Sequence, residues 1–368
     1  MMKRSEKKTE PTVRATGEDA YFAASNSAGG FHSYYSACFD HARVGRLYAV
    51  KGGPGTGKSR FLREVAKRGE AGGWHAEYIY CSSDPDSLDG VILTQKEREG
   101  IALLDATAPH VYEPSRPGYR EEIVNLGAFW NGERLREERD AIAALNRKKQ
   151  NAYGRTYRYL AGYGEMTATR DELAAPFLRA DAIANYAEKL MKDVPEGETF
   201  SEQTALIRSV GMCGAVTLDT FFAASEKRYC VEDCRGSAWA LMGALYRIAA
   251  KKKLKIRVSY DPVLPEKIDG LFLSDAKICF AVSHGEKIPL PHRVLSTRRF
   301  VETGEMHDIR GELNFAERMR RAMLEGALEQ LEEVRKIHFS VEDIYIRAMD
   351  FEAKERFTEA FCKSLFGE

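Results

Sequence analysis

A glycine-rich stretch that ends in lysine and serine has the spacing needed to bind phosphate groups. Residues 52–59 read Gly-Gly-Pro-Gly-Thr-Gly-Lys-Ser, the G-x-x-x-x-G-K-[ST] pattern of a P-loop. Glycines let the backbone wrap a phosphate chain with N–H groups turned inward, and a following helix adds the positive end of its dipole. We expect Lys58 to reach the β- and γ-phosphates and the Ser59 hydroxyl to bind Mg²⁺. The predicted nucleotide-binding residues are Gly52, Gly53, Pro54, Gly55, Thr56, Gly57, Lys58 and Ser59.

A P-loop nucleoside triphosphatase also needs a Walker B carboxylate, placed at the end of a neighbouring strand to hold Mg²⁺. Asp105 ends the apolar run 101–104 and is the best candidate. We therefore predict Lys58 and Asp105 as catalytic residues, and Ser59 and Asp105 as metal ligands. The alternative for Asp105 is a surface turn at the end of a strand.

Other polar residues near these strands have less specific signals. Asp84 and Asp89 precede a proline and a glycine, and Asp261 and Asp269 recur at matching places later in the chain, which favours structural turn roles. His110 follows the Asp105 strand and is either a group that senses the γ-phosphate or positions water, or a surface or packing residue. No arginine finger can be singled out. A guanine-specific [NT]KxD element is absent after residue 59, so ATP is expected by elimination.

The elements that must position these residues alternate between strand and helix patterns. Apolar strand signals cover residues 20–25, 47–50, 75–81, 88–93 and 101–105, and a helix is expected after residue 59. This alternation indicates a mostly parallel α/β sheet with helices on both faces. A long helix is then expected around 135–159, and a second from a capping box at 169–172 to about residue 191. Residues 192–201 are predicted to be a linker.

After this linker the pattern repeats roughly 180 residues further on. Residues 228–231 match 47–50, residues 268–273 match 88–93, and residues 278–282 match 101–105. Helices expected at 314–336 and 341–366 match the earlier helical pair. We therefore predict two tandem P-loop NTPase-like domains, each a three-layer α/β/α unit with an appended helical hairpin. The predicted divisions are a disordered tail at 1–17, a P-loop domain at 18–195 and a degenerate repeat at 202–368.

The second half lacks the residues that would bind a triphosphate. Residues 233–240 read Asp-Cys-Arg-Gly-Ser-Ala-Trp-Ala, which places Trp239 and Ala240 where lysine and serine are needed. Glu232 and Asp233 would repel phosphates. We expect this half to act as a scaffold or as the surface for a protein partner.

Composition excludes several classes of protein. Lysine plus arginine and aspartate plus glutamate number 55 each, so there is no strong electrostatic case for nucleic-acid binding. No apolar run approaches the ~20 residues of a membrane-spanning helix, and the charged segment 1–17, which includes Lys3, Arg4, Lys7 and Lys8, lacks the core of a signal peptide. The seven cysteines form no CxxC pair and suit a reducing compartment. A cytoplasmic location without membrane insertion is expected.

Three segments together resemble a known family. Residues 50–59, 81–90 and 102–110 are similar to those of a poorly characterised family of bacterial P-loop ATPases found largely in Firmicutes. The resemblance covers most of the chain and implies a cytoplasmic ATP-binding protein with two P-loop-like halves. The sequence departs from that pattern at 233–240, and the resemblance carries no substrate.

The leading functional hypothesis is an ATPase that binds and hydrolyses MgATP in its first half. A small-molecule kinase, with a base such as Asp84 or His110, is the second hypothesis. The third is a nucleotide-dependent interaction switch with little turnover.

Overall fold

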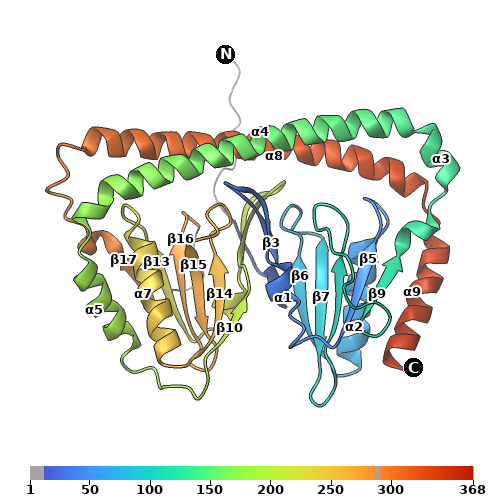
Figure 1. The fold of residues 1–368 in the computed structure, drawn as a ribbon, viewed down its shortest axis with the longest axis horizontal. Coiled ribbons are helices and arrows are strands. Elements are labelled where there is room, and N and C mark those ends of the chain that lie inside the picture. The colour runs from blue at the N-terminus through green and yellow to red at the C-terminus, as the bar shows by residue number, and fades with distance from the viewer. Residues whose placement is uncertain (1–11, 287, 289–290, 368) are drawn as a thin grey trace.

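Two six-stranded sheets with the same strand order form the body of the protein. They are seen in a computed structural model, which describes residues 12–286, 288 and 291–367 (Figure 1). In the first sheet the order is β2 (Asp19–Phe22), β6 (His75–Tyr80), β7 (Leu88–Thr94), β8 (Ile101–Asp105), β5 (Arg46–Lys51) and β9 (Glu121–Asn125). In the second it is β10 (Ser201–Thr204), β14 (Lys255–Tyr260), β15 (Ile268–Leu273), β16 (Ile278–Ser283), β13 (Lys227–Glu232) and β17 (Arg293–Ser296).

Each sheet is mixed rather than mostly parallel. β7 runs antiparallel to β6 and β8, and β15 runs antiparallel to β14 and β16. The connection from β6 to β7 spans only residues 81–87, which is too short for a parallel crossover and suits an antiparallel return. The α/β class is confirmed, and the expectation of a mostly parallel sheet is corrected. As a result, the start of β7 lies at the same edge as the carboxyl ends of β5 and β8.

Helices cover only the outer face of each sheet. Helices α2 (Lys58–Ala71) and α9 (Phe351–Phe366) pack on the first sheet, and α5 (Ala180–Met191) and α7 (Ser237–Lys251) pack on the second. The inner faces of the two sheets share one continuous buried cluster, which includes α1 (Tyr35–Cys38) and α6 (Thr220–Ala223). These two helices have four residues each, too few to cover a sheet face. The predicted pair of separate three-layer units is therefore wrong, because each half covers the inner face of the other.

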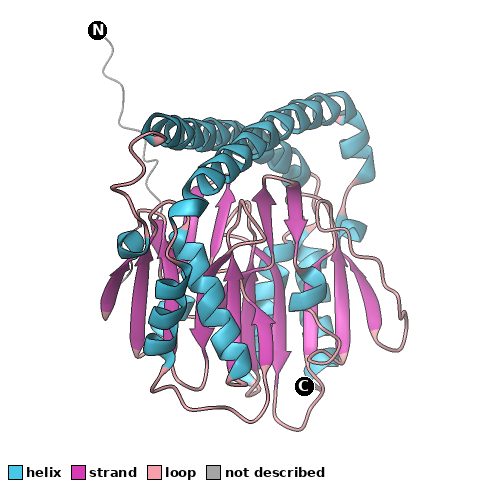
Figure 2. Cartoon of the chain, turned by 60° about the vertical axis from the view of Figure 1, so that its left-hand side comes forward, coloured by secondary structure: helices cyan, strands magenta, loops and turns pink. Residues whose placement is uncertain are grey.

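Two long helices exchange between the halves. Helix α4 (Arg139–Ala174) and helix α8 (Arg310–Arg347) pack side by side across one end of both sheets (Figures 1 and 2). At 1.5 Å per residue, the 36 residues of α4 extend about 54 Å. Helix α4 leaves the first sheet and leads to α5 on the second, and α8 returns to place α9 on the first. The second helix of each expected hairpin thus packs on the opposite sheet, which corrects the prediction that the hairpin would be appended to its own half.

The expected helix start at 169–172 is also wrong. Thr169 lies inside α4, where its hydroxyl donates to the carbonyl of Glu165 at 2.9 Å instead of capping a new helix. The break comes later, in the short turn Ala175–Phe177 that contains Pro176. The break expected between residues 336 and 341 is also wrong, because α8 continues unbroken from Arg310 to Arg347.

Smaller elements join the halves near the middle of the molecule. Strand β1 (Thr12–Arg14) pairs with β12 (Gly214–Leu218), which pairs with β11 (Arg208–Gly211). Residues 12–14 are thus ordered in a sheet rather than part of a disordered tail, while the basic residues at positions 3, 4, 7 and 8 lie outside the described residues. The other elements are β3 (Ala24–Ser27), β4 (Gly30–Ser33), α3 (Gly132–Glu137) and the short 3₁₀ turns at Leu126–Phe129 and Thr297–Phe300.

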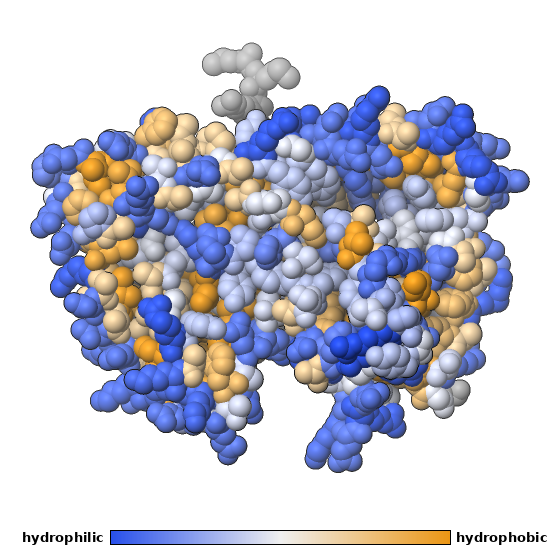
Figure 3. Space-filling model, viewed as in Figure 1, coloured by the Kyte–Doolittle hydropathy of each residue, from blue (hydrophilic) through white to orange (hydrophobic). Residues whose placement is uncertain are grey.

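The described helices do not include one that is both long enough and apolar enough to cross a bilayer. The face shown in Figure 3 is mostly hydrophilic, and its apolar residues lie in scattered groups.

Candidate functional site

The glycine-rich loop 52–59 connects the end of β5 to the start of α2. Gly55 and Gly57 have φ angles of 70° and 75°, in the left-handed region that favours glycine. The Thr56 hydroxyl donates to the Gly53 carbonyl at 2.9 Å and closes the turn. The loop therefore ends at a helix N-terminus, where N–H groups without helical partners can receive an anion.

The structure brings Lys58 and Asp105 together. Strands β5 and β8 are parallel neighbours, with Val50 directly opposite Asp105, and the Lys58 Nζ lies 3.5 Å from the Asp105 Oδ2. The same ammonium group donates to the carbonyls of Gly52 and Gly53 at 2.8 and 2.9 Å. Lys58 is therefore held across the mouth of the loop by two loop carbonyls and by Asp105.

Thr107 braces this arrangement from the end of β8. Its backbone N–H donates to the Asp105 Oδ1 at 2.8 Å, and its hydroxyl donates to the Gly52 carbonyl at 2.7 Å. The hydroxyl oxygen of Ser59 accepts from the Leu88 N–H at 2.9 Å, which fixes Ser59 at the start of β7. Hydroxyl and carboxylate oxygens are the ligand atoms that Mg²⁺ prefers, so Ser59 and Asp105, at one edge of the sheet, suit this ion.

A buried acid–histidine pair lies beside Asp105. Asp89 is within β7, and its Oδ2 lies 3.0 Å from the His110 Nε2, with both side chains buried. The predicted turn role is therefore wrong for Asp89, because the antiparallel β7 carries this carboxylate to the same edge as Asp105. The turn role is confirmed for Asp84, whose carboxylate accepts from the Asp86 N–H at 3.3 Å and the Ser87 hydroxyl at 3.0 Å.

Burial and neighbouring charges set the protonation of this cluster. Burial raises the pKa of Asp105, Lys58 opposes that rise, and Asp89 adds to it. For His110, burial favours the neutral ring, but the charges of Asp89 and Asp105 outweigh burial and leave its pKa raised. The His110 ring also stacks on Tyr35 with centroids 4.8 Å apart. His110 is thus fixed as part of the cluster rather than lying on the surface.

The exchanged helix α8 covers the glycine-rich loop, which the sequence did not indicate. A Cβ atom added at Gly55 would lie 2.9 Å from both the Glu342 carbonyl oxygen and the Ile346 Cγ1. The Trp130 ring lies against Gly53 and packs on Tyr345, with ring centroids 5.4 Å apart. The loop is therefore closed by residues that lie far away in the sequence.

Charged groups of both long helices also face this site. The Glu342 carboxylate faces the Gly55 N–H, and its pKa is raised chiefly by burial. Burial lowers the pKa of His338 to about 4, and the positive charges of Lys149 and Lys58 add to this effect. No local pattern relates Lys149 on α4 or Glu342 on α8 to the loop, since only the helix exchange brings them to it.

The corresponding loop of the second half is occupied by its own carboxylate. Arg235 and Gly236 have left-handed φ angles of 58° and 87° ahead of α7. The Asp233 carboxylate accepts from the backbone N–H groups of Gly236 and Ala238 at 3.2 and 3.1 Å. Arg170 on α4, which is buried, lies 3.2 Å from the same carboxylate. The N–H groups that would face a phosphate here are therefore already bonded to Asp233.

A second cluster with metal-ligand geometry lies in this half. Asp261, Asp269 and His284 place one ligand atom each within 4.8 Å of one another. Asp269 is also paired with the buried Arg208, which in turn contacts Glu286. The carboxylate of Asp261 accepts from the Val263 and Leu264 N–H groups at 2.9 and 2.8 Å, so its predicted turn role is confirmed. Asp269, like Asp89, lies within a strand instead of a turn.

Comparisons with protein-family models, with curated proteins and with solved structures gave no match to this chain.

Proposed function

We propose that the protein is an ATPase that binds and hydrolyses MgATP at the glycine-rich loop 52–59. The observation that carries the proposal is the contact between Lys58 and Asp105 at the carboxyl ends of two adjacent parallel strands, directly beside the loop. A P-loop needs this combination of a phosphate-binding lysine and a neighbouring acid. The left-handed Gly55 and Gly57, followed by α2, support the same reading.

Each residue then has a defined task. The loop N–H groups and the start of α2 bind the phosphates, and Lys58 stabilises the negative charge of the transferred phosphoryl group. Ser59 and Asp105 hold Mg²⁺, which supplies charge neutralisation on the phosphates. His110, held by Asp89, positions a water molecule or senses the terminal phosphate.

Part of α8 lies where a bound phosphate would be. The Glu342 carboxylate faces the Gly55 N–H, a group that a P-loop offers to phosphate. A phosphate at this position would displace a carboxylate of the same sign, so nucleotide binding favours movement of this end of α8. The fold thus links occupancy of the first half to a helix that begins in the second half.

The test is an assay with γ-labelled ATP on the full chain, the Lys58→Ala variant and Lys67→Ala as the control. Lys67 is an exposed lysine of the same helix, so the control removes an equal charge away from the loop. We expect the parent and Lys67→Ala to release free phosphate without an acceptor, and Lys58→Ala to lose both binding and turnover.

The other outcomes separate the alternatives. Label that appears on a metabolite would identify a kinase, and tight binding without turnover would identify a nucleotide-dependent switch. If Lys58→Ala binds MgATP as tightly as the parent, the assignment of the site is wrong.

A further inference from the structure

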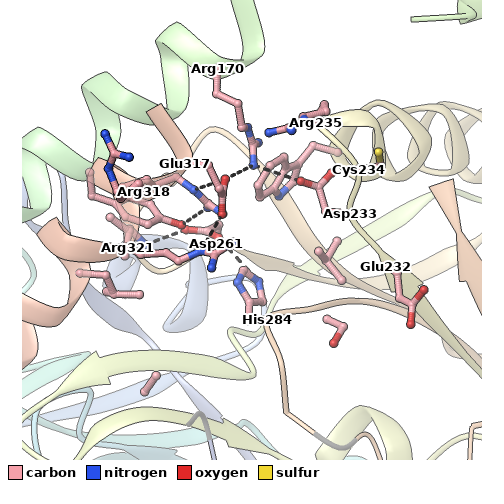
Figure 4. Close-up of a pocket in the computed structure, with 18 of the residues that line it drawn as sticks. Arg170, Glu232, Asp233, Cys234, Arg235, Asp261, His284, Glu317, Arg318 and Arg321 are labelled. Atoms are coloured by element: carbon pink, nitrogen blue, oxygen red, sulfur yellow. Dashed lines mark hydrogen bonds and ion pairs between the residues drawn. The ribbon is translucent and has the colours of Figure 1, made fainter. Parts of the chain in front are cut away.

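A cavity of about 1610 Å³ lies in the second half, away from the glycine-rich loop 52–59. It is lined by the loop 232–235, by the end of β16 and by the first half of α8 (Figure 4). Ligand pockets typically measure about 300–1,000 Å³, so this cavity has room for a small molecule and its hydration water. Nothing in the proposed ATPase mechanism uses it.

Arginine dominates the charged lining of this cavity. Among the described residues, its walls contain eight arginines and five carboxylates and no lysine. Even without any charge on His284, the lining therefore has an excess of positive charge, which remains when Asp269 and Glu286, the partners of Arg208, are counted. Such an excess in a concave, partly desolvated site attracts anions.

The deeper arginines are already neutralised. Arg170 lies 3.2 Å from Asp233 and 3.8 Å from Glu317, and Arg320 lies 3.0 Å from Glu317. Figure 4 shows the Arg170, Asp233 and Glu317 side chains joined in one network. These residues form the structure of the wall, so an incoming ligand must use other groups.

Four further arginines of the lining have no acidic partner within ion-pair distance in the described part of the chain. They are Arg235, Arg298, Arg310 and Arg318. Arg310 and Arg318 flank Asn314 at four-residue steps on one face of α8, and the Arg235 guanidinium lies 3.4 Å from the Asn314 Oδ1. Arginines from the loop and from α8 are thus brought to the same wall of the cavity.

We propose that this cavity binds a small polyanion, a molecule with two or more adjacent phosphate or carboxylate groups. The loop backbone does not hold the anion, because Asp233 already accepts from the N–H groups of Gly236 and Ala238 at the start of α7. The ligand is held instead by guanidinium groups, whose planar pairs of N–H donors match phosphate and carboxylate oxygens. The second half is then a ligand-binding unit of a different kind, rather than an inactive copy of the first.

The test is isothermal titration calorimetry with inorganic pyrophosphate and, separately, with citrate. The full chain carries Lys58→Ala in every sample, so that the proposed ATP site does not contribute. We compare this chain with one that also carries Arg235→Gln and Arg318→Gln. The matched control carries Arg335→Gln and Lys336→Gln, which remove two exposed positive charges from α8 outside the cavity.

We expect at least one probe to bind saturably to the Lys58→Ala chain, and to bind at least tenfold more weakly when Arg235 and Arg318 are replaced. The control should bind within twofold of the Lys58→Ala chain. Unfolding midpoints of all samples identify any variant that fails to fold, in which case Arg318→Lys alone replaces the double change and should weaken binding in the same direction. Absence of saturable binding, or equal weakening in the control, would overturn the proposal. Because the first site is disabled throughout, neither result depends on the ATPase assignment.

Discussion

Replacing Gly55 by alanine should measure how tightly α8 closes over the glycine-rich loop. Gly55 has a φ of 70°, and an L-residue in this region costs about 1–2 kcal/mol. The added Cβ would lie 2.9 Å from the Glu342 carbonyl oxygen and from the Ile346 Cγ1. Because one of these atoms belongs to the helix backbone, the contact cannot be relieved by a side-chain rotation alone.

Such overpacking usually costs about 1–3 kcal/mol. Gly55→Ala should therefore destabilise the protein by about 2–5 kcal/mol in all. The matched control is Gly118→Ala, since Gly118 also has a positive φ, 86°, and an added Cβ there meets no atom within 4 Å. The free energy of unfolding of the control should fall only by the cost of the left-handed backbone conformation, about 1–2 kcal/mol.

The assay is urea unfolding monitored by far-UV circular dichroism. The free energy of unfolding of each variant is compared with that of the parent. A double-mutant cycle with Ile346→Ala tests the contact itself, because that change removes one of the two clashing groups. The cost of Gly55→Ala should fall in the Ile346→Ala background. If Gly55→Ala costs no more than Gly118→Ala, and Ile346→Ala does not change this cost, then α8 does not pack on the loop as described.

Two further substitutions test charges at the two sites. Arg208→Met should destabilise the protein by about 3–5 kcal/mol at neutral pH, because it leaves the buried carboxylates of Asp269 and Glu286 without their cation. Burial alone would raise the pKa of Asp269, but Arg208 helps hold it at about 2, so the stabilisation is present above the ordinary value of 3.8 and is lost as the pH falls through 2. The deficit of Arg208→Met should therefore shrink between those two pH values, and a deficit in urea midpoint that is independent of pH would contradict this account. Glu342→Gln should tighten MgATP binding about tenfold in calorimetry, because it removes a negative charge that faces the Gly55 N–H, and unchanged or weaker binding would contradict it.

Local signals were sufficient to predict the centre of the candidate site. The loop 52–59 lies between a strand and a helix as expected, and Asp105 follows the strand beside it. These features depend on short-range patterns, namely glycine spacing, an apolar run and the acid at its end. Lys58 and Asp105 could therefore be paired without knowledge of the rest of the fold.

The roles of Asp89 and His110 could not be predicted in this way. Their pairing depends on β7 running antiparallel, which brings Asp89 to the edge where the chain leaves β8. Strand direction depends on how the whole sheet pairs, and an Asp-Gly step within the sequence is more typical of a turn. The recurrence of aspartate at position 269 reflects a second acid–histidine pair, with the partly exposed His284, instead of a second turn.

The exchange of helices between the halves could not be predicted from the sequence for a related reason. An amphipathic pattern shows which face of a helix is buried but not which partner covers it. The stripe along 135–159 is equally compatible with a hairpin on its own sheet and with a helix that crosses to the other. Lys149 and Glu342 therefore carry no signal of their positions, although Lys149 and Lys58 both lower the pKa of His338 and Lys58 also acts on Glu342.

Helix α8 gives the two sites a physical connection. Its first half lines the arginine-rich cavity with Arg310 and Arg318, and its other end lies against the glycine-rich loop through Glu342 and Ile346. Because α8 is one continuous helix, a ligand that shifts it as a unit at one end would also shift the other end. Phosphate at the loop competes with Glu342, and a polyanion in the cavity would hold the arginines of the same helix. If the two ligands favour different positions of α8, their binding is coupled. By reciprocity, each ligand must then change the affinity for the other by the same factor.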